Sequence, residues 1–115
     1  SDNTKDILHT LAYLSLFTGH YEEAYTIYNE LVNTEKEDDA NTLFLASVAS
    51  IGANHPDSAI GYLELAKLTN PTYSEARLAL GFLYQEIGNI DAAITQYSGL
   101  GDSKYQSQFF TFRLE

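Results

Sequence analysis

A repeat spaced by about one helical hairpin constrains this 115-residue chain more than any other feature of its sequence. The stretches 18–31, 53–66 and 87–100 superimpose, and in each a Gly or Asn is followed five residues later by Ala and nine residues later by Tyr or Leu. The anchor residues are Gly19, Ala24 and Tyr28, then Asn54, Ala59 and Leu63, then Gly88, Ala93 and Tyr97. A chain with such a period builds its core by packing each repeat on its neighbours.

Each anchor set follows a second stretch with helical spacing of apolar residues, so every unit is predicted to be a helix, a tight turn and a second helix. We expect helices near 4–17, 21–33, 40–53, 57–69, 73–86 and 90–98. The expected turns hold Gly19, the stretch 53–56 (ANHP), the stretch 69–71 (TNP) and Gly88, which are typical helix-breaking residues. The predicted fold class is therefore all-α, with three antiparallel helix pairs.

At these positions the sequence resembles the tetratricopeptide repeat family, whose pattern has Leu-Gly-x-x-Tyr in the first helix, Gly at the turn, and Ala and an aromatic residue in the second helix. Repeat three matches with Leu80, Gly81, Tyr84, Gly88, Ala93 and Tyr97; repeat two with Ala46, Ser47, Ala59, Ala66 and Pro71; repeat one with Leu11, Ala12, Gly19, Tyr21, Ala24, Tyr28 and Leu31. The resemblance covers about residues 5–104. It implies a solenoid within a single domain, 1–115, with repeats at about 5–39, 40–73 and 74–101.

Gly81 lies inside an expected helix, where glycine costs about 1 kcal/mol relative to alanine. Ala12 and Ser47 hold the same position in the other two repeats. We expect small side chains here to let the two helices of a repeat approach closely. Asn54 stands where the family has Gly at the turn.

Residues 102–115 are expected to form a C-terminal capping helix after Gly99 and Gly101, with Tyr105, Phe109 and Phe112 on one face. This helix would cover the last repeat, because a repeat array needs a terminal element over its apolar end. It would also fit the first helix of a truncated fourth repeat. A third interpretation makes its aromatic side chains an exposed docking face.

The charge balance limits the classes of partner. Sixteen acidic residues against six basic ones give a net charge of −10, which argues against nucleic acid and against an anionic membrane surface. No apolar run is long enough for membrane insertion. Cysteine and methionine are absent, so disulfides and Cys-ligated zinc are excluded, and we expect a fragment of a longer protein. The compartment stays open between cytoplasm and periplasm.

The resemblance implies a concave groove lined by the first helix of each repeat, which in the family takes extended peptides or helices. Carried over position by position, the expected partner-binding residues are His9, Tyr13, Phe17, Phe44, Val48, Phe82 and Gln85. The basic clamp with which some family members hold a C-terminal carboxylate is missing. An apolar segment of a partner protein suits this lining better.

Side chains that would suit a metal or catalytic site occur at the turns, where His20 and His55 hold equivalent places with Glu23 and Asp57 nearby. No metalloprotease pattern, phosphate loop or paired nucleophile and base accompanies them. We therefore expect a non-catalytic protein without a metal or other cofactor. The acidic run 35–41 is expected to be a solvated loop that caps the next helix.

Three functions remain open from the sequence. The first is an adaptor or scaffold module, by analogy within a bacterial assembly protein. The second is a small acidic chaperone of a secreted or translocated protein, because stretch 17–32 resembles the first repeat of type III secretion chaperones. The third is homo-oligomerisation through the C-terminal helix or the groove.

Overall fold

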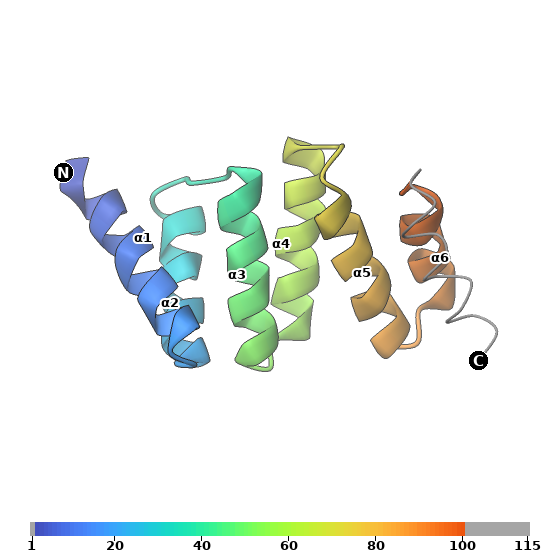
Figure 1. Ribbon diagram of the computed structural model, residues 1–115, viewed down its shortest axis with the longest axis horizontal. Coiled ribbons are helices and arrows are strands. Elements are labelled where there is room, and N and C mark those ends of the chain that lie inside the picture. Colours follow the sequence, from blue (N-terminus) through green and yellow to red (C-terminus); the bar gives the residue numbers. More distant parts are fainter. Residues whose placement is uncertain (1, 101–115) are drawn as a thin grey trace. The chain divides into compact units, whose positions relative to one another are not determined.

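The computed structural model describes residues 2–100, and these residues form six α-helices and no strand (Figure 1). The helices are α1 (Asp2–Phe17), α2 (Tyr21–Asn33), α3 (Ala40–Gly52), α4 (Pro56–Thr69), α5 (Ser74–Glu86) and α6 (Ile90–Ser98). Their bounds lie within two residues of those expected from the sequence, and the predicted all-α class of antiparallel helix pairs is confirmed. The expected capping helix at 102–115 lies outside the described residues.

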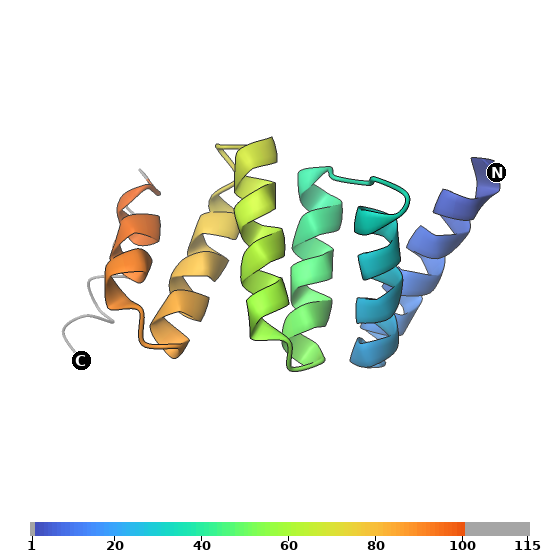
Figure 2. The same ribbon diagram turned by 180° about the vertical axis from the view of Figure 1, so that it is seen from behind.

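The chain divides into two compact units, Ser1–Pro71 with α1 to α4 and Thr72–Glu115 with α5 and α6. In the first unit α2 packs between α1 and α3, and α3 also packs on α4. Helices α1 and α3 lie on the side nearer the viewer in Figure 1, whereas α2 and α4 are nearer in Figure 2. In the second unit α5 packs on α6. The division into repeats at 5–39, 40–73 and 74–101 within one domain remains a prediction.

All three helix pairs close through the same kind of turn. Gly19, Asn54 and Gly88 have positive φ angles of 83°, 65° and 84°. The residue after each donates its backbone N–H to a carbonyl five residues earlier, as His20 does to Ser15 at 2.8 Å. This is the Schellman arrangement, which pairs the last carbonyls of a helix and favours glycine at the left-handed position. Asn54 replaces glycine there because asparagine tolerates that conformation better than most residues.

The small residues expected at helix contacts are buried. Ala12, Ser47 and Gly81 are all inaccessible or nearly so. A Cβ added to Gly81 would collide with the ring of Tyr97 on α6. The close approach of α5 to α6 therefore explains why glycine is used inside this helix, despite its low helix propensity.

The acidic loop before α3 caps that helix, as predicted. The Asp39 carboxylate accepts a hydrogen bond from the backbone N–H of Thr42 at 3.1 Å and another from the Thr42 hydroxyl at 2.7 Å. An N-cap side chain of this kind satisfies an amide that has no partner within the helix. The start of α3 is thus fixed by local chemistry rather than by packing alone.

The core follows the repeat pattern at most positions, but not at all of them. The largest fully buried apolar side chains are Tyr28, Leu31, Leu43, Leu63 and Leu80. Leu11, which the pattern assigns to packing, is instead 48% exposed. Its counterpart on α5, Leu80, is fully buried. Leu11 is exposed because, within the described part of the first unit, α2 packs on another side of α1.

Candidate functional site

Among the side chains expected to line the groove, that of Phe17 on α1 is the most exposed large apolar one. Phe17 is 79% exposed and Tyr13 is 52% exposed, and their rings stack with centroids 6.2 Å apart at an interplanar angle of 12°. They are four residues apart, so they lie on one face of the helix. Exposing this much aromatic surface is costly unless a ligand covers it, because a phenylalanine gains about 1.5–3 kcal/mol on full burial.

The third groove residue on α1 has a partner within the chain. His9 Nε2 lies 2.9 Å from Glu37 Oε1, and Lys5 Nζ lies 3.6 Å from Glu37 Oε2. The hydrogen bond from His9, with the charge of Lys5, holds the pKa of the Glu37 carboxyl below its ordinary value. The expected solvated loop thus carries one carboxylate that ties it to α1. The sequence shows the acidic run but not which of its residues meets α1.

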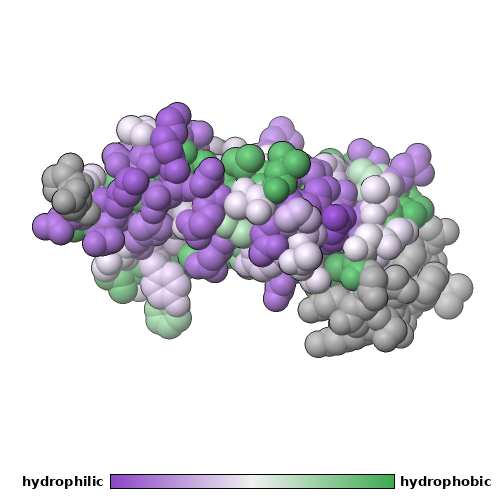
Figure 3. Space-filling model, turned by 90° about the horizontal axis from the view of Figure 1, so that it is seen from above, coloured by the Kyte–Doolittle hydropathy of each residue, from purple (hydrophilic) through white to green (hydrophobic). Residues whose placement is uncertain are grey.

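The groove residues of α3 are less exposed than those of α1. Phe44 and Val48 are half-buried and lie one turn apart on α3. Helices α1, with Tyr13 and Phe17, and α3, with Phe44 and Val48, lie on the same side of the first unit (Figures 1 and 2). We call these four residues the aromatic face. Figure 3 shows hydrophobic side chains projecting between hydrophilic ones at the end of the chain that holds α1.

The two expected groove residues of the second unit also serve its core. Phe82 is 41% exposed, and its ring meets Tyr97 edge-on with centroids 5.9 Å apart. Gln85 Oε1 accepts a hydrogen bond from the Tyr97 hydroxyl at 3.2 Å. Tyr97 belongs to the buried cluster of this unit with Ala93. A substitution of Phe82 or Gln85 would therefore disturb packing as well as any ligand.

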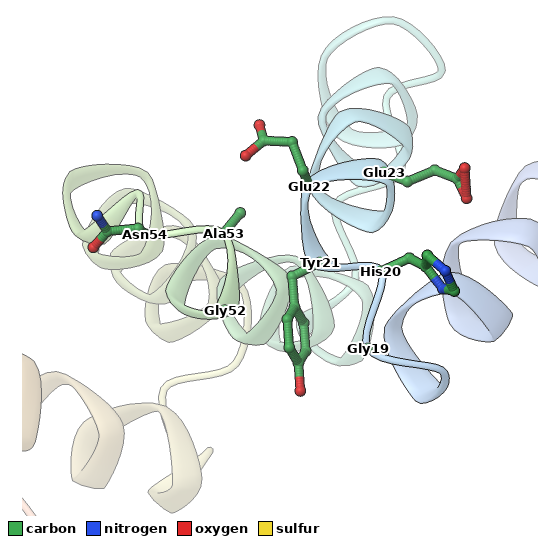
Figure 4. Close-up of a pocket in the computed structure, with 8 residues that line it drawn as sticks. All are labelled: Gly19, His20, Tyr21, Glu22, Glu23, Gly52, Ala53 and Asn54. Carbon is green, nitrogen blue, oxygen red and sulfur yellow. The ribbon is translucent and has the colours of Figure 1, made fainter.

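A hollow of about 570 Å³ lies at the helix turns of the first unit (Figure 4). None of the predicted groove residues lines it. Its lining is Gly19, His20, Tyr21, Glu22, Glu23, Gly52, Ala53 and Asn54. In Figure 4 the carboxylates of Glu22 and Glu23 point to opposite sides, and the Tyr21 ring lies along Gly52. Divergent carboxylates are a poor cation site, because a cation needs converging oxygens.

The turn histidines have structural partners. His20 Nδ1 lies 2.8 Å from the Thr18 hydroxyl. His55 stacks on Tyr25 with centroids 4.3 Å apart, and its Nε2 lies 3.2 Å from Glu22 Oε1. The His55 contacts join the turn before α4 to α2. Among residues 2–100 no group of three or more His, Cys, Asp or Glu side chains could hold a metal ion.

Sequence reasoning missed an apolar row on another side of α1. Ile7, Leu11 and Leu14 are 55, 48 and 53% exposed. The sequence shows their helical spacing, which is the usual sign of a buried face. Only the position of α2 reveals that this face stays uncovered in the described part of the first unit.

A family model described as a tetratricopeptide repeat matches residues 6–38. The chain carries a tetratricopeptide repeat. The match covers α1, α2 and most of the loop that follows, and it confirms the resemblance seen in the sequence. No curated protein matches the chain by sequence. In the part of the chain that the structure describes, no helix is both long enough and apolar enough to cross a membrane.

Solved structures share the fold at low sequence identity. A crystal structure of MamA has a TM-score of 0.78 and 23% identity, covering 87% of this chain and 58% of that one. PcrH, solved in complex with the chaperone binding region of PopB, has a TM-score of 0.76 and 15% identity, covering 87% and 80%. The Sgt2 tetratricopeptide domain from Aspergillus fumigatus has a TM-score of 0.71 and 16% identity, covering 96% and 82%. The fold is thus shared with these helical-repeat structures, and this chain spans less than two thirds of the MamA chain.

Proposed function

We propose that this chain is a non-catalytic interaction module that binds an apolar segment of a partner protein on the aromatic face. The observation that carries the proposal is the 79% exposure of Phe17, stacked on Tyr13. Aromatic side chains that are exposed, rigid and grouped are typical anchors of protein interfaces. Phe44 and Val48 extend this surface onto α3. In the second unit, taken by itself, Phe82 and Gln85 are the proposed partner-binding residues.

The chemistry of the lining favours an apolar ligand over a charged one. His9, the groove residue that could carry positive charge, is engaged by Glu37 in the structure. A partner carboxylate would have to compete with that contact, whereas an apolar side chain could pack directly on Tyr13 and Phe17. A helix or extended segment with large apolar residues fits this requirement.

A chaperone for a secreted or translocated protein is the second candidate. It is favoured by the likeness to PcrH, whose structure holds the chaperone binding region of PopB. The two candidates share the same surface and differ in the fate of the ligand. If the partner is exported, and if it aggregates in cells that lack this chain, the chaperone role is the correct one.

Photocrosslinking tests the binding surface directly. A benzophenone amino acid would replace Phe17, and in a control it would replace Leu68 on α4. Leu68 has a matching exposure of 76% and belongs to α4, which lies behind α3 in Figure 1 and nearer the viewer in Figure 2. We expect a specific protein adduct from position 17 and none from position 68. Equal adducts from both positions, or none from either, would refute the proposed face.

The affinity of the identified partner gives the second measurement. Phe17→Glu should weaken binding by about tenfold or more, because burial of a phenylalanine is worth roughly 1.5–3 kcal/mol. Leu68→Glu should leave the affinity unchanged. Both variants should keep the wild-type circular dichroism spectrum, since neither side chain is in the core.

A further inference from the structure

One polar atom in the core of the first unit has no partner. The Tyr28 side chain is fully buried, and among residues 2–100 no group accepts or donates a hydrogen bond to its hydroxyl. A buried hydroxyl left unpaired costs free energy, because the group has given up its bonds to water. Native structures hold few such groups, so this one calls for a physical explanation.

The second unit shows how the equivalent tyrosine is satisfied. Tyr97 on α6 holds the repeat position that Tyr28 holds on α2. Its hydroxyl donates a hydrogen bond to Gln85 Oε1 on α5 at 3.2 Å. The residue of α1 at the position of Gln85 is Leu16, which has no acceptor atom in its side chain. The Tyr28 hydroxyl therefore lacks a partner because the repeat has an apolar side chain where its acceptor would stand.

This hydroxyl lies close to Tyr13 of the aromatic face. Burial raises the pKa of Tyr28 to about 12, and the nearby Tyr13 raises it further. The equivalent residues of the second unit, Phe82 and Tyr97, are in ring contact with centroids 5.9 Å apart. Both observations place the hydroxyl toward α1. It is protonated at neutral pH, so it can donate a hydrogen bond.

A bound segment could reach this hydroxyl without disturbing the core. Tyr13 is 52% exposed, and Leu16 on the same helix is half-buried. Exposed side chains exchange rotamers within nanoseconds, so the Tyr13 ring can turn when a ligand packs on the aromatic face. An acceptor on the ligand would then meet a donor that no group of residues 2–100 occupies.

The surroundings of the hydroxyl favour a neutral acceptor. A carboxylate would lose its hydration among apolar side chains for a single hydrogen bond, which is far more costly than the burial of an amide. Gln85 shows that a side-chain amide oxygen fits opposite a tyrosine at this position of the repeat. An amide also has an NH₂ group, which can remain in water at the edge of the contact.

We propose that Tyr28 is a specificity-determining residue of the aromatic face, and that its hydroxyl donates a hydrogen bond to the amide oxygen of a partner glutamine or asparagine. The inference rests on the proposed function and adds a chemical requirement to it. The partner segment is apolar except for one amide side chain among its large residues. It gives the first unit the acceptor that Gln85 gives the second.

Parallel selection from a display library of random 15-residue peptides tests the proposal. The library is applied to the full wild-type chain, to Tyr28→Phe and to Phe17→Glu, each checked for folding by circular dichroism. The wild type should enrich apolar peptides with Gln or Asn at one fixed place. Tyr28→Phe should enrich apolar peptides without that amide. Phe17→Glu should enrich neither class, which checks the aromatic face independently of Tyr28.

The affinity of the most enriched peptide locates the hydrogen bond. Tyr28→Phe should weaken this peptide by about tenfold in fluorescence anisotropy, and so should replacement of the peptide's amide residue by an apolar residue of similar size. The two changes together should weaken binding no more than either alone, because they remove the same bond.

A substitution on α1 gives a second, independent measurement. Leu16→Gln offers Tyr28 an acceptor within the chain, as Gln85 does for Tyr97, so it should also reduce the preference for the amide peptide. Leu16→Met conserves the apolar character and nearly the volume of the side chain, and should leave the preference unchanged.

Three results would overturn the proposal. The first is enrichment of the same amide-bearing peptides by Tyr28→Phe, because the hydroxyl would then have no part in binding. The second is a wild-type selection without Gln or Asn that Phe17→Glu still abolishes; the aromatic face would stand and only the role of Tyr28 would fall. The third is a wild type that enriches nothing, or the same peptides as Phe17→Glu, which would remove the aromatic face and this inference together.

Discussion

Adding one methyl group to Gly81 tests the close packing on which the second unit rests. In the structure a Cβ at this position would overlap the ring of Tyr97, which is 3% exposed and bonded through its hydroxyl to Gln85. Gly61 on α4 supplies the matched control. It is also inside a helix, and a Cβ there would meet no atom within 4 Å.

The two substitutions should change the free energy of unfolding in opposite directions. Replacing glycine by alanine inside a helix gains about 1 kcal/mol from propensity, so Gly61→Ala should stabilise the chain by about that amount. At Gly81 the same gain is opposed by overpacking, which typically costs 1–3 kcal/mol. In repeat one, Ala12 and Tyr28 hold the positions of Gly81 and Tyr97, and both are buried. The fold therefore accepts alanine at this position beside a tyrosine, and α5 and α6 could move apart to accept a methyl group. We therefore expect Gly81→Ala to lower the free energy of unfolding by about 1 kcal/mol. Its free energy of unfolding should then be about 2 kcal/mol lower than that of Gly61→Ala.

Urea unfolding followed by circular dichroism at the helical band measures both changes. A second background isolates the cause, because Tyr97→Leu places at α6 the residue that repeat two has at Leu63. Once the ring is gone, Gly81→Ala should become stabilising, like Gly61→Ala. If Gly81→Ala stabilises the wild type as much as Gly61→Ala does, the close approach of α5 and α6 is not what selects glycine here.

Three further predictions follow from single contacts. Tyr28→Phe should stabilise by about 1 kcal/mol in urea unfolding, because the Tyr28 hydroxyl is buried without a hydrogen-bond partner in the described part of the chain, and burial raises its pKa to about 12. Asp39→Ala should destabilise by about 1 kcal/mol in the same assay, because it removes the acceptor for the Thr42 amide; no change would mean that the cap is dispensable. Glu37 has a folded-state pKa below its ordinary value of 4.5, so its contribution is present above that pH and is lost as pH falls through the lowered pKa. The unfolding free energy should therefore fall less between pH 5 and 3 in Glu37→Gln than in the wild type, and His9→Ala should reduce that difference, because only the Lys5 charge then lowers the pKa of Glu37.

The helices and turns could be predicted because local chemistry sets them. A period of 34 or 35 residues fixes two helices per unit, and the breakers at Gly19 and Gly88 require the left-handed backbone that the structure has there. Asn54 occupies the same conformation, so the departure from glycine at that turn is accommodated without changing the fold. Asp39 was predictable as a cap for the same reason, since a capping side chain acts on its own helix.

The candidate site was less predictable because it depends on what covers each face. Tyr13 and Phe82 hold equivalent positions in the repeat, yet Tyr13 stacks on an exposed Phe17 whereas Phe82 leans on the buried Tyr97. Helical periodicity shows that Leu11 shares a face with Ile7, but not whether another helix packs there. The exposure of each of these side chains depends on tertiary contacts, which the spacing of residues in the sequence does not predict.

Helix α1 connects the stability of the chain to its binding. Within α1 the buried side chains in the described residues are Ala12 and Ser15, whereas α3 buries six. The large apolar side chains of Tyr13, Leu14 and Phe17 are each more than half exposed. A helix with so little burial has a low free energy of local opening, so α1 is expected to open more readily than α3. A ligand on the aromatic face stabilises the form to which it binds by mass action, so binding there should make the local opening of α1 rarer.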